Sequence, residues 1–236
     1  MQALFFGAAK KNAIMEFIPE KIFYASSLSP FPKILDRRAV WGEQGRMYST
    51  LEKAILLALS DGGFAALDAP DSSLARAYAA SAAADLFILG LIPAVSGNSR
   101  PPKFRASRGR VFERSAEAAA ECADLRTAAR ELEKIAPELE RLCVEEMLEK
   151  SALMAARQFG FFGREVLKVS DARACRKIRE SVFAAVSGER GADFGVAALI
   201  WALFCGGLEG VALSRAQLRR FRGRALEIAD GFCPAE

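Results

Sequence analysis

The pattern of apolar and polar positions predicts a chain made mainly of α-helices from residue 49 onward. The stretch STLEKAILLALSDGG begins with Ser49 and Glu52 spaced as a capping box, repeats apolar residues at helical spacing, and ends at two glycines. An alanine-rich segment follows over 71–89 and stops at Gly90, and apolar residues recur over 113–134 with charged residues on the opposite face. Further helices are expected over about 138–150, 171–187, 192–208 and 214–231, the last with a second capping box at Ser214 and Gln217.

Two segments interrupt this helical pattern and favour β-hairpins. LIPAVSGNS, directly after Gly90, is typical of a strand that runs into a turn. SALMAARQFGFFGREVLKV, directly after Lys150, is typical of two strands around Gly160 to Gly163. The expected fold is therefore mainly α: a single-domain helical bundle with one or two β-hairpins.

The most apolar segment, FGVAALIWALFCGGLEGVAL over 194–213, contains one charged residue, Glu209. Its uncharged run from Gly195 to Leu208 has 14 residues. As a helix this run measures about 21 Å, whereas the hydrocarbon core of a bilayer is roughly 30 Å thick. Both faces of the helix are apolar, as in a helix that is surrounded by others. We therefore expect the central helix of the bundle here, and no transmembrane span.

The first 46 residues differ from the rest of the chain. They mix short apolar runs with Pro19, Pro30 and Pro32 and show no sustained period. Two lysines interrupt the first apolar run, which is unlike a secretory signal. We expect residues 1–46 to be an N-terminal extension, either a loosely attached arm or residues upstream of a true start at Met47, and residues 47–233 to form the helical domain.

The composition excludes several kinds of active site. The chain has no histidine, which removes imidazole bases, Ser-His-Asp and Cys-His nucleophiles and His-ligated zinc. The five cysteines, Cys122, Cys143, Cys175, Cys205 and Cys233, form no C-x-x-C pair. We expect them to be reduced core residues of a cytoplasmic protein, without a disulfide or a metal. Glycine-rich phosphate loops and a nucleophile elbow are also missing, so the sequence favours a protein without a cofactor or a catalytic step.

Basic residues gather in two places, although the net charge is only +4. RPPKFRASRGRVFER, expected as a loop over 100–114, carries six cations against Glu113 alone, namely Arg100, Lys103, Arg105, Arg108, Arg110 and Arg114. On the last expected helix, Arg215, Arg219 and Arg222 form one stripe, with Arg220 and Arg224 beside it. Each such residue near an anionic leaflet contributes about 1 kcal/mol of attraction. The alternative for each cluster is a solvated surface: a solvated loop over 100–114 and a solvated face of the last helix.

Four segments resemble, in their order and spacing, the Golgi phosphoprotein 3-like domain family: STLEKAILLALSDGG, AAADLFILGLI, LERLCVEEMLEKSALMAARQFGFF and GVAALIWALFCGGLEGV. The resemblance covers roughly residues 48–230 and lies in the set of four, because single leucine-rich helices are common. The alanine- and arginine-rich composition fits a bacterial member of the family.

This resemblance implies a mostly α-helical domain on a membrane surface. Eukaryotic members bind phosphatidylinositol 4-phosphate through a tryptophan and several arginines, and use an apolar β-hairpin for self-association and membrane contact. Arg76 and Arg141 are the arginines of this chain that lie nearest to the family positions. LDAPDSS stands where the family tryptophan would fall, and Glu138 and Glu140 precede Arg141, so the phosphoinositide pocket is only partly matched.

The expected hairpin carries three phenylalanines at or near its tip, Phe159, Phe161 and Phe162. Exposed aromatic side chains at a tip can enter a bilayer interface or bury in a second copy of the chain, which would make a homo-oligomer. The alternative is that they fold back on the core of the same chain.

The function expected from the sequence is that of a non-catalytic peripheral membrane or adaptor protein that binds anionic lipid headgroups. One alternative is a winged-helix nucleic-acid-binding protein, since a helix followed by a hairpin occurs twice. Nucleic acid is disfavoured as a partner because ELERLCVEEMLEK, the candidate recognition helix, carries far more glutamates than basic residues. A protein-protein adaptor without lipid binding is the other alternative.

Overall fold

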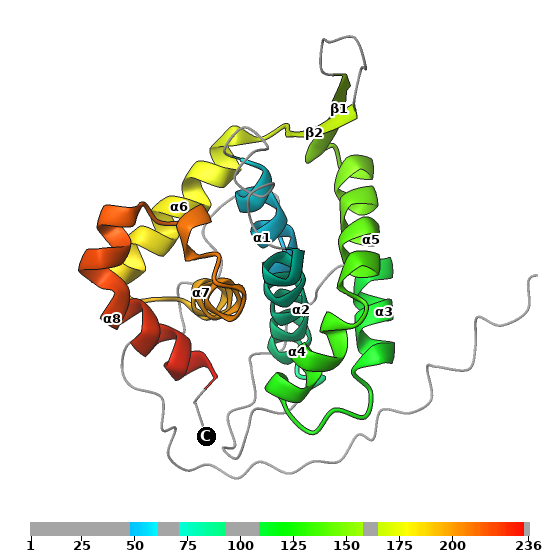
Figure 1. Cartoon of the computed structure of the whole chain (residues 1–236), viewed down its shortest axis with the longest axis horizontal. Helices are drawn as coiled ribbons and strands as arrows, with labels where there is room; N and C mark the ends of the chain where they lie inside the picture. The colour runs from blue at the N-terminus through cyan, green and yellow to red at the C-terminus, as the bar shows by residue number, and fades with distance from the viewer. Residues whose placement is uncertain (1–47, 61–70, 93–108, 158–164, 234–236) are drawn as a thin grey trace, which may run out of the picture.

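The computed structural model describes residues 48–60, 71–92, 109–157 and 165–233, and within them the fold is mainly α with one small β-hairpin (Figure 1). The elements are α1 Thr50–Leu59, α2 Asp71–Ile88, α3 Arg110–Ala118, α4 Leu125–Glu133, α5 Ala136–Glu149, β1 Leu153–Arg157, β2 Glu165–Val169, α6 Ala172–Ser187, α7 Phe194–Gly206, the 3-10 turn Glu209–Val211 and α8 Arg215–Phe232. The expected fold class is confirmed. Residues 1–46, expected as an extension, lie outside the described residues.

Both capping boxes expected from the sequence are present. At α1, the Glu52 backbone N–H donates to Ser49 Oγ at 3.1 Å, and the Ser49 N–H donates to Glu52 Oε2 at 2.8 Å. At α8, Ser214 and Gln217 make the same reciprocal pair. These bonds satisfy amide groups that a helix start leaves without an intrahelical acceptor.

A half-buried carboxylate on α2 also holds the start of α1. Asp85 accepts the Thr50 N–H at 2.7 Å and the Leu51 N–H at 3.1 Å. Burial raises the pKa of the Asp85 carboxyl, while the two backbone hydrogen bonds act in the opposite direction. The contact fixes the first turn of α1 against the middle of the bundle.

The apolar helix α7 lies in the core, as the sequence predicts. It packs against α2 and is flanked by α1, α6 and α8, and Figure 1 shows it nearly end-on in the middle of the bundle. Trp201 of α7 and Phe232 of α8 have ring centroids 5.6 Å apart, and Phe232 also meets Phe87 of α2 edge-on at 5.4 Å. The alanine-rich α2 shares the centre, since it contacts α1, α3, α4, α5 and α7. Among the described helices, none combines the length and apolar character needed to cross a bilayer.

The segment 113–134 is two helices, where the sequence pattern indicates one. α3 ends at Ala118, a turn follows, and Asp124 caps α4 by accepting the Thr127 N–H at 2.7 Å. Apolar residues keep their helical spacing through the turn, so the periodicity conceals the break. A short polar side chain that competes for a backbone N–H is the physical reason for the new helix start.

The hairpin expected after Lys150 is confirmed. β1 and β2 pair antiparallel, with Leu153 opposite Val169 and Arg157 opposite Glu165. The hairpin stands out beyond the end of α5 (Figure 1). Of the other expected strand, only Leu91 and Ile92 are described, and they form a bend.

Close packing of α7 against α2 depends on Gly206. A Cβ atom at this position would lie 2.5 Å from the Ser73 carbonyl oxygen and 2.6 Å from Ala77 Cβ. Backbone atoms cannot rotate away as a long side chain can. The absence of a side chain at Gly206 therefore sets the distance between the two helices.

We expect Gly206→Ala to lower the free energy of unfolding by about 1–3 kcal/mol, because overpacking of a close helix contact forces the backbone apart. Gly223→Ala on α8 is the matched control, since a Cβ there meets nothing within 4 Å. Replacing a glycine inside a helix should instead raise stability by about 0.5–1 kcal/mol. Urea denaturation measures both changes, and a Gly206→Ala protein as stable as the parent would contradict the packing argument.

Candidate anion-binding pocket

Most of the site residues expected from the sequence lie outside the described residues. These are Arg100, Lys103, Arg105 and Arg108 of the basic segment, and Phe159, Phe161 and Phe162 of the hairpin tip. Arg76, Arg110 and Arg141 are described, and the structure places them in very different surroundings.

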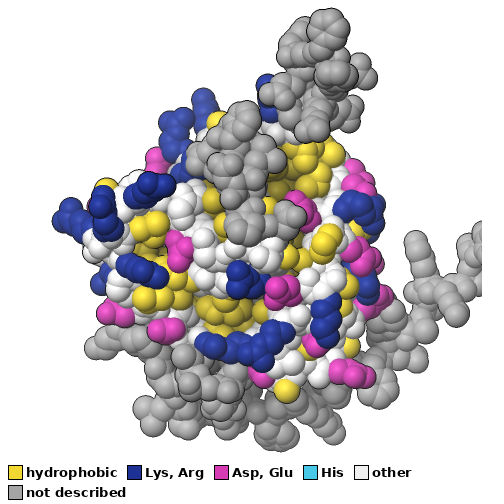
Figure 2. Space-filling view, in the orientation of Figure 1, with side chains coloured by type: hydrophobic (Ala, Val, Ile, Leu, Met, Phe, Trp, Pro, Cys, Tyr) yellow, Lys and Arg dark blue, Asp and Glu magenta, His cyan; other side chains and the backbone are white. Residues whose placement is uncertain are grey.

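Arg110 and Arg141 both pair with glutamates of α5. Arg110 is the first residue of α3, where a loop was expected, and it contacts Glu145 Oε2 at 3.2 Å and Glu149 Oε1 at 2.8 Å. Arg141 contacts the other oxygen of Glu145 at 2.5 Å. Figure 2 shows basic and acidic side chains alternating over this side of the molecule. The glutamates offset the positive charge of both arginines. Neither Arg110 nor Arg141 lines the pocket that Arg76 borders.

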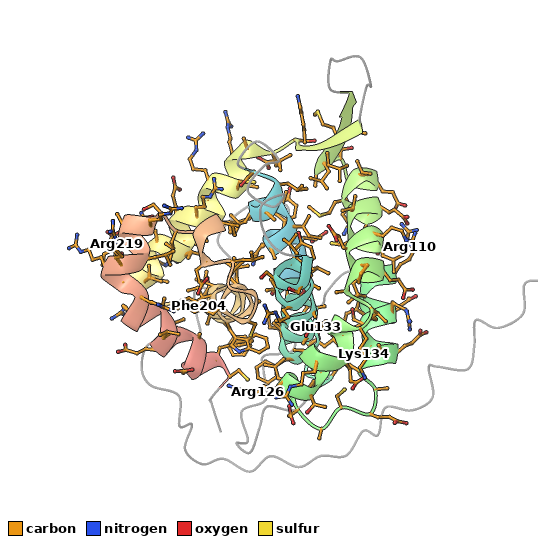
Figure 3. All side chains as sticks on the ribbon, viewed as in Figure 1. Arg110, Arg126, Glu133, Lys134, Phe204 and Arg219 are labelled. Carbon is orange, nitrogen blue, oxygen red and sulfur yellow. The ribbon has the colours of Figure 1, made fainter. Side chains whose placement is uncertain are left out.

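Arg76 borders an open pocket of about 300 Å³ between α2, α4 and α7. The pocket is lined by Arg76 and Ala80 of α2, by Arg126, Ala129, Arg130 and Glu133 of α4, and by Trp201 and Cys205 of α7. In Figure 3, the labels of Arg126 and Glu133 identify α4 and the label of Phe204 identifies α7, two of the three helices that line the pocket.

Three arginine side chains therefore line one pocket. Arg126 and Arg130 are four residues apart and share a face of α4, while Arg76 approaches from α2. Arg76 Nε donates to the Ser72 carbonyl at 3.1 Å, and Arg126 Nη2 donates to the Cys233 carbonyl at 3.2 Å. A guanidinium has five N–H donors in a fixed plane, so these bonds set the orientation of the Arg76 and Arg126 groups.

The wall of the pocket opposite α4 is apolar. Trp201 is only 6% exposed and presents part of its indole ring, next to the small side chain of Ala80. Cys205 is exposed, whereas a core position was expected from the sequence, and neighbouring protein atoms still raise the pKa of its thiol. At neutral pH this thiol is protonated and uncharged, which is unlike a reactive cysteine.

The charges of the lining side chains favour an anion. Three arginines against one carboxylate, that of Glu133, leave two formal positive charges (3 − 1 = 2) at the pocket. Guanidinium groups bind phosphate and carboxylate oxygens through paired, charge-assisted hydrogen bonds. In the part of the chain that is described, no group of three or more cysteine or acidic side chains is arranged to hold a metal ion.

Sequence reasoning found Arg76 but missed Arg126, Arg130 and Trp201 as site residues. The spacing of Arg126 and Arg130 on one helix face was the available signal. Trp201 was placed in the core, and it does lie there, with one edge at the pocket. These residues come together only through the packing of three helices. No local sequence pattern predicts that packing.

The chain matches no model of a known protein family, and a search of curated proteins finds no match. The assignment of the pocket therefore depends on its own geometry and charge.

The N-cap of α4 holds two of the three pocket arginines in place, and it should respond to pH. Hydrogen bonds from Thr127 lower the pKa of Asp124. Because the pKa of this carboxyl is lower in the folded protein than in the unfolded chain, its ionised form stabilises the fold at every pH above the unfolded-state pKa of about 4. This stabilisation is lost as the pH falls through the folded-state pKa. We expect Asp124→Ala to cost about 0.5–2 kcal/mol of unfolding free energy at pH 7.

The difference between Asp124→Ala and the parent protein should shrink toward pH 3, as measured by urea denaturation at each pH. Asp124→Asn is the control, because asparagine keeps an oxygen acceptor at the N-cap and should lose less stability at pH 7. A difference that grows as the pH falls would contradict this account of the cap.

Proposed function

We propose that this chain is a non-catalytic protein that binds anionic lipid headgroups at a membrane surface, through the pocket formed by Arg76, Arg126 and Arg130. The observation that carries the proposal is that these three arginines line one pocket together with Trp201. The protein would act in the cytoplasm as a peripheral membrane protein.

The chemistry of the pocket favours a phosphomonoester over a phosphodiester headgroup. A phosphomonoester carries between one and two negative charges at neutral pH and presents three oxygens as acceptors. Three arginines at one pocket match the charge and the three oxygens of a phosphomonoester, whereas a phosphodiester has one charge to share between them. The volume of about 300 Å³ is at the lower end of ligand pockets, which suits a headgroup and not a whole lipid.

The resemblance to the Golgi phosphoprotein 3-like family supports the same ligand class. Eukaryotic members of that family bind phosphatidylinositol 4-phosphate through one tryptophan and several arginines. The pocket of this chain contains the same residue types at other positions. Trp201 comes from α7, not from the segment before α2. The headgroup preferred by this chain is therefore part of the proposal to be tested.

Self-association through the hairpin stays a prediction. Within the described part of the hairpin, Met154 on β1 is 49% exposed, so the stem offers one large apolar side chain to solvent. A homo-oligomer formed there would leave the pocket open, because β1 makes its described helix contacts with α5 and the pocket is lined by α2, α4 and α7.

We expect Arg76→Ala and Arg130→Ala each to weaken binding to phosphatidylcholine vesicles that carry phosphatidylinositol 4-phosphate by about 10-fold or more. The reason is that a charge-assisted hydrogen bond is worth about 1.5–3 kcal/mol, and 1.4 kcal/mol is a tenfold change in affinity. Co-sedimentation with vesicles at fixed ionic strength measures the effect.

Lys134→Ala is the matched control for the pocket variants. Lys134 lies just after α4, carries the same charge as the pocket arginines, and pairs with Glu131 at 2.6 Å outside the pocket lining. Its removal should change binding by less than about twofold, since paired surface charges contribute little. Equal losses from Lys134→Ala and Arg130→Ala would overturn the assignment of the pocket.

A further inference from the structure

A second group of cations lies on α6 and α8, on the side of the bundle away from α3 and α5. The exposed members are Arg173, Arg176 and Lys177 of α6 and Arg215, Arg219, Arg220 and Arg222 of α8. None of these seven lies within ion-pair distance of a described carboxylate, whereas the cations of α3 and Arg141 of α5 are paired. We call these seven residues the α6–α8 basic face. Figure 2 shows basic side chains dominating this side of the molecule.

The cations on α8 form a narrow stripe that ends in an apolar residue. Arg215, Arg219, Arg222 and Leu226 follow at intervals of four, three and four residues, which places them within about 60° of arc on a helix with 3.6 residues per turn. Leu226 is 40% exposed, although Ile228 two residues later is buried in the core. Figure 3 shows Arg219 pointing away from the body of the protein.

Packing contacts hold α6 and α8 in a fixed relative position. Phe183 of α6 meets Phe221 of α8 edge-on, with ring centroids 5.9 Å apart, and the Arg220 guanidinium lies 5.0 Å from the centre of the Phe221 ring. The Arg224 Nε–H donates to the Ala185 carbonyl of α6 at 3.2 Å. The exposed cations therefore extend from two helices that are fixed to each other.

We propose that the α6–α8 basic face lies flat against an anionic bilayer. The guanidinium groups contact lipid phosphates, and Leu226 enters the boundary between headgroups and acyl chains. This surface is separate from the pocket and acts on the summed negative charge of the leaflet, so it needs no particular headgroup. It goes beyond the proposed function because it sets the side on which the protein attaches.

The exposed leucine favours a bilayer over a nucleic acid as the partner. Both surfaces offer phosphates to arginine, but a leucine within the same stripe finds an apolar medium only at a bilayer. A stripe of about 16 Å from Arg215 to Leu226, estimated from the helical rise, matches an amphipathic helix that lies in the plane of the interface.

The first test compares two triple variants with the same change of charge. In one, Arg215, Arg219 and Arg222 are replaced by alanine, and in the other Arg110, Lys134 and Arg141, which are paired with glutamates, are replaced by alanine. The vesicles contain phosphatidylcholine and phosphatidylserine, without a phosphomonoester. We expect the α8 triple variant to bind about 100-fold more weakly, since each arginine contributes about fivefold, and the paired triple variant to lose less than about fivefold.

The second test replaces the leucine. Leu226→Ala should weaken binding to the same vesicles about fivefold. Leu91→Ala, which changes a leucine that is 56% exposed just after α2 and is not on α6 or α8, should leave binding unchanged. Circular dichroism confirms that each variant keeps its helical content. A loss from Leu226→Ala alone supports insertion of this side chain into the interface.

Several outcomes would overturn the proposal. Equal losses from the two triple variants would mean that net charge alone matters, and an unchanged α8 variant would remove the face from membrane contact. Retention of duplex DNA without any vesicle binding by the parent protein would assign the face to nucleic acid. The vesicle composition separates the two proposals, because the phosphatidylserine vesicles carry no phosphomonoester and test the α6–α8 basic face, whereas the vesicles with phosphatidylinositol 4-phosphate test the pocket.

Discussion

The contact between α7 and α2 determines the rest of the structure. α7 is apolar on all sides, so it must be surrounded, and the alanines of α2 allow a neighbouring helix to come close. Gly206 at the end of α7 meets the backbone of α2 at Ser73 and Ala77, where any side chain would collide. This approach brings Trp201 and Cys205 to the same pocket as Arg76.

Pairing, and not the number of charges, decides which arginines are available to a partner. The glutamates of α5 lie within 4 Å of Arg110, Arg114 and Arg141, so the field of each guanidinium is offset locally. Such exposed pairs add little stability, but they lower the positive potential that an approaching anion meets. The cations of the α6–α8 basic face lie elsewhere on the bundle, and none of them pairs with a described carboxylate.

Local features of the sequence were enough to predict most of the fold. Capping boxes at Ser49 and Ser214 and the uncharged run in α7 act within a few residues, and each produced the expected element. The break before α4 was missed because Asp124 acts through one side-chain hydrogen bond, which leaves the apolar period intact. Of the described residues predicted to bind lipid, Arg76 lines the pocket, whereas Arg110 and Arg141 do not.

The remaining site residues could not be predicted because their roles depend on contacts between distant segments. Arg126 is anchored by the carbonyl of Cys233, which is 107 positions away, and Arg110 is paired across 35 positions with Glu145. A guanidinium has the same sequence signature whether a glutamate lies beside it or not. The helical period predicts which face of a helix an arginine occupies, but it does not predict which residues pack against that face.

Helix α8 connects the two proposed surfaces in one rigid element. Its exposed side carries Arg215, Arg219 and Arg222, and its C-cap carbonyl at Cys233 anchors Arg126 at the pocket. A protein that is already held against a leaflet by diffuse charge meets a headgroup at a high effective concentration, because the loss of translational freedom has occurred in the first contact. Weak, nonselective attraction through α8 can therefore raise the occupancy of a pocket whose own affinity is modest. The same coupling requires that both surfaces face one leaflet, and the packing of α8 on α7 and α6 holds the two surfaces in a fixed relative position.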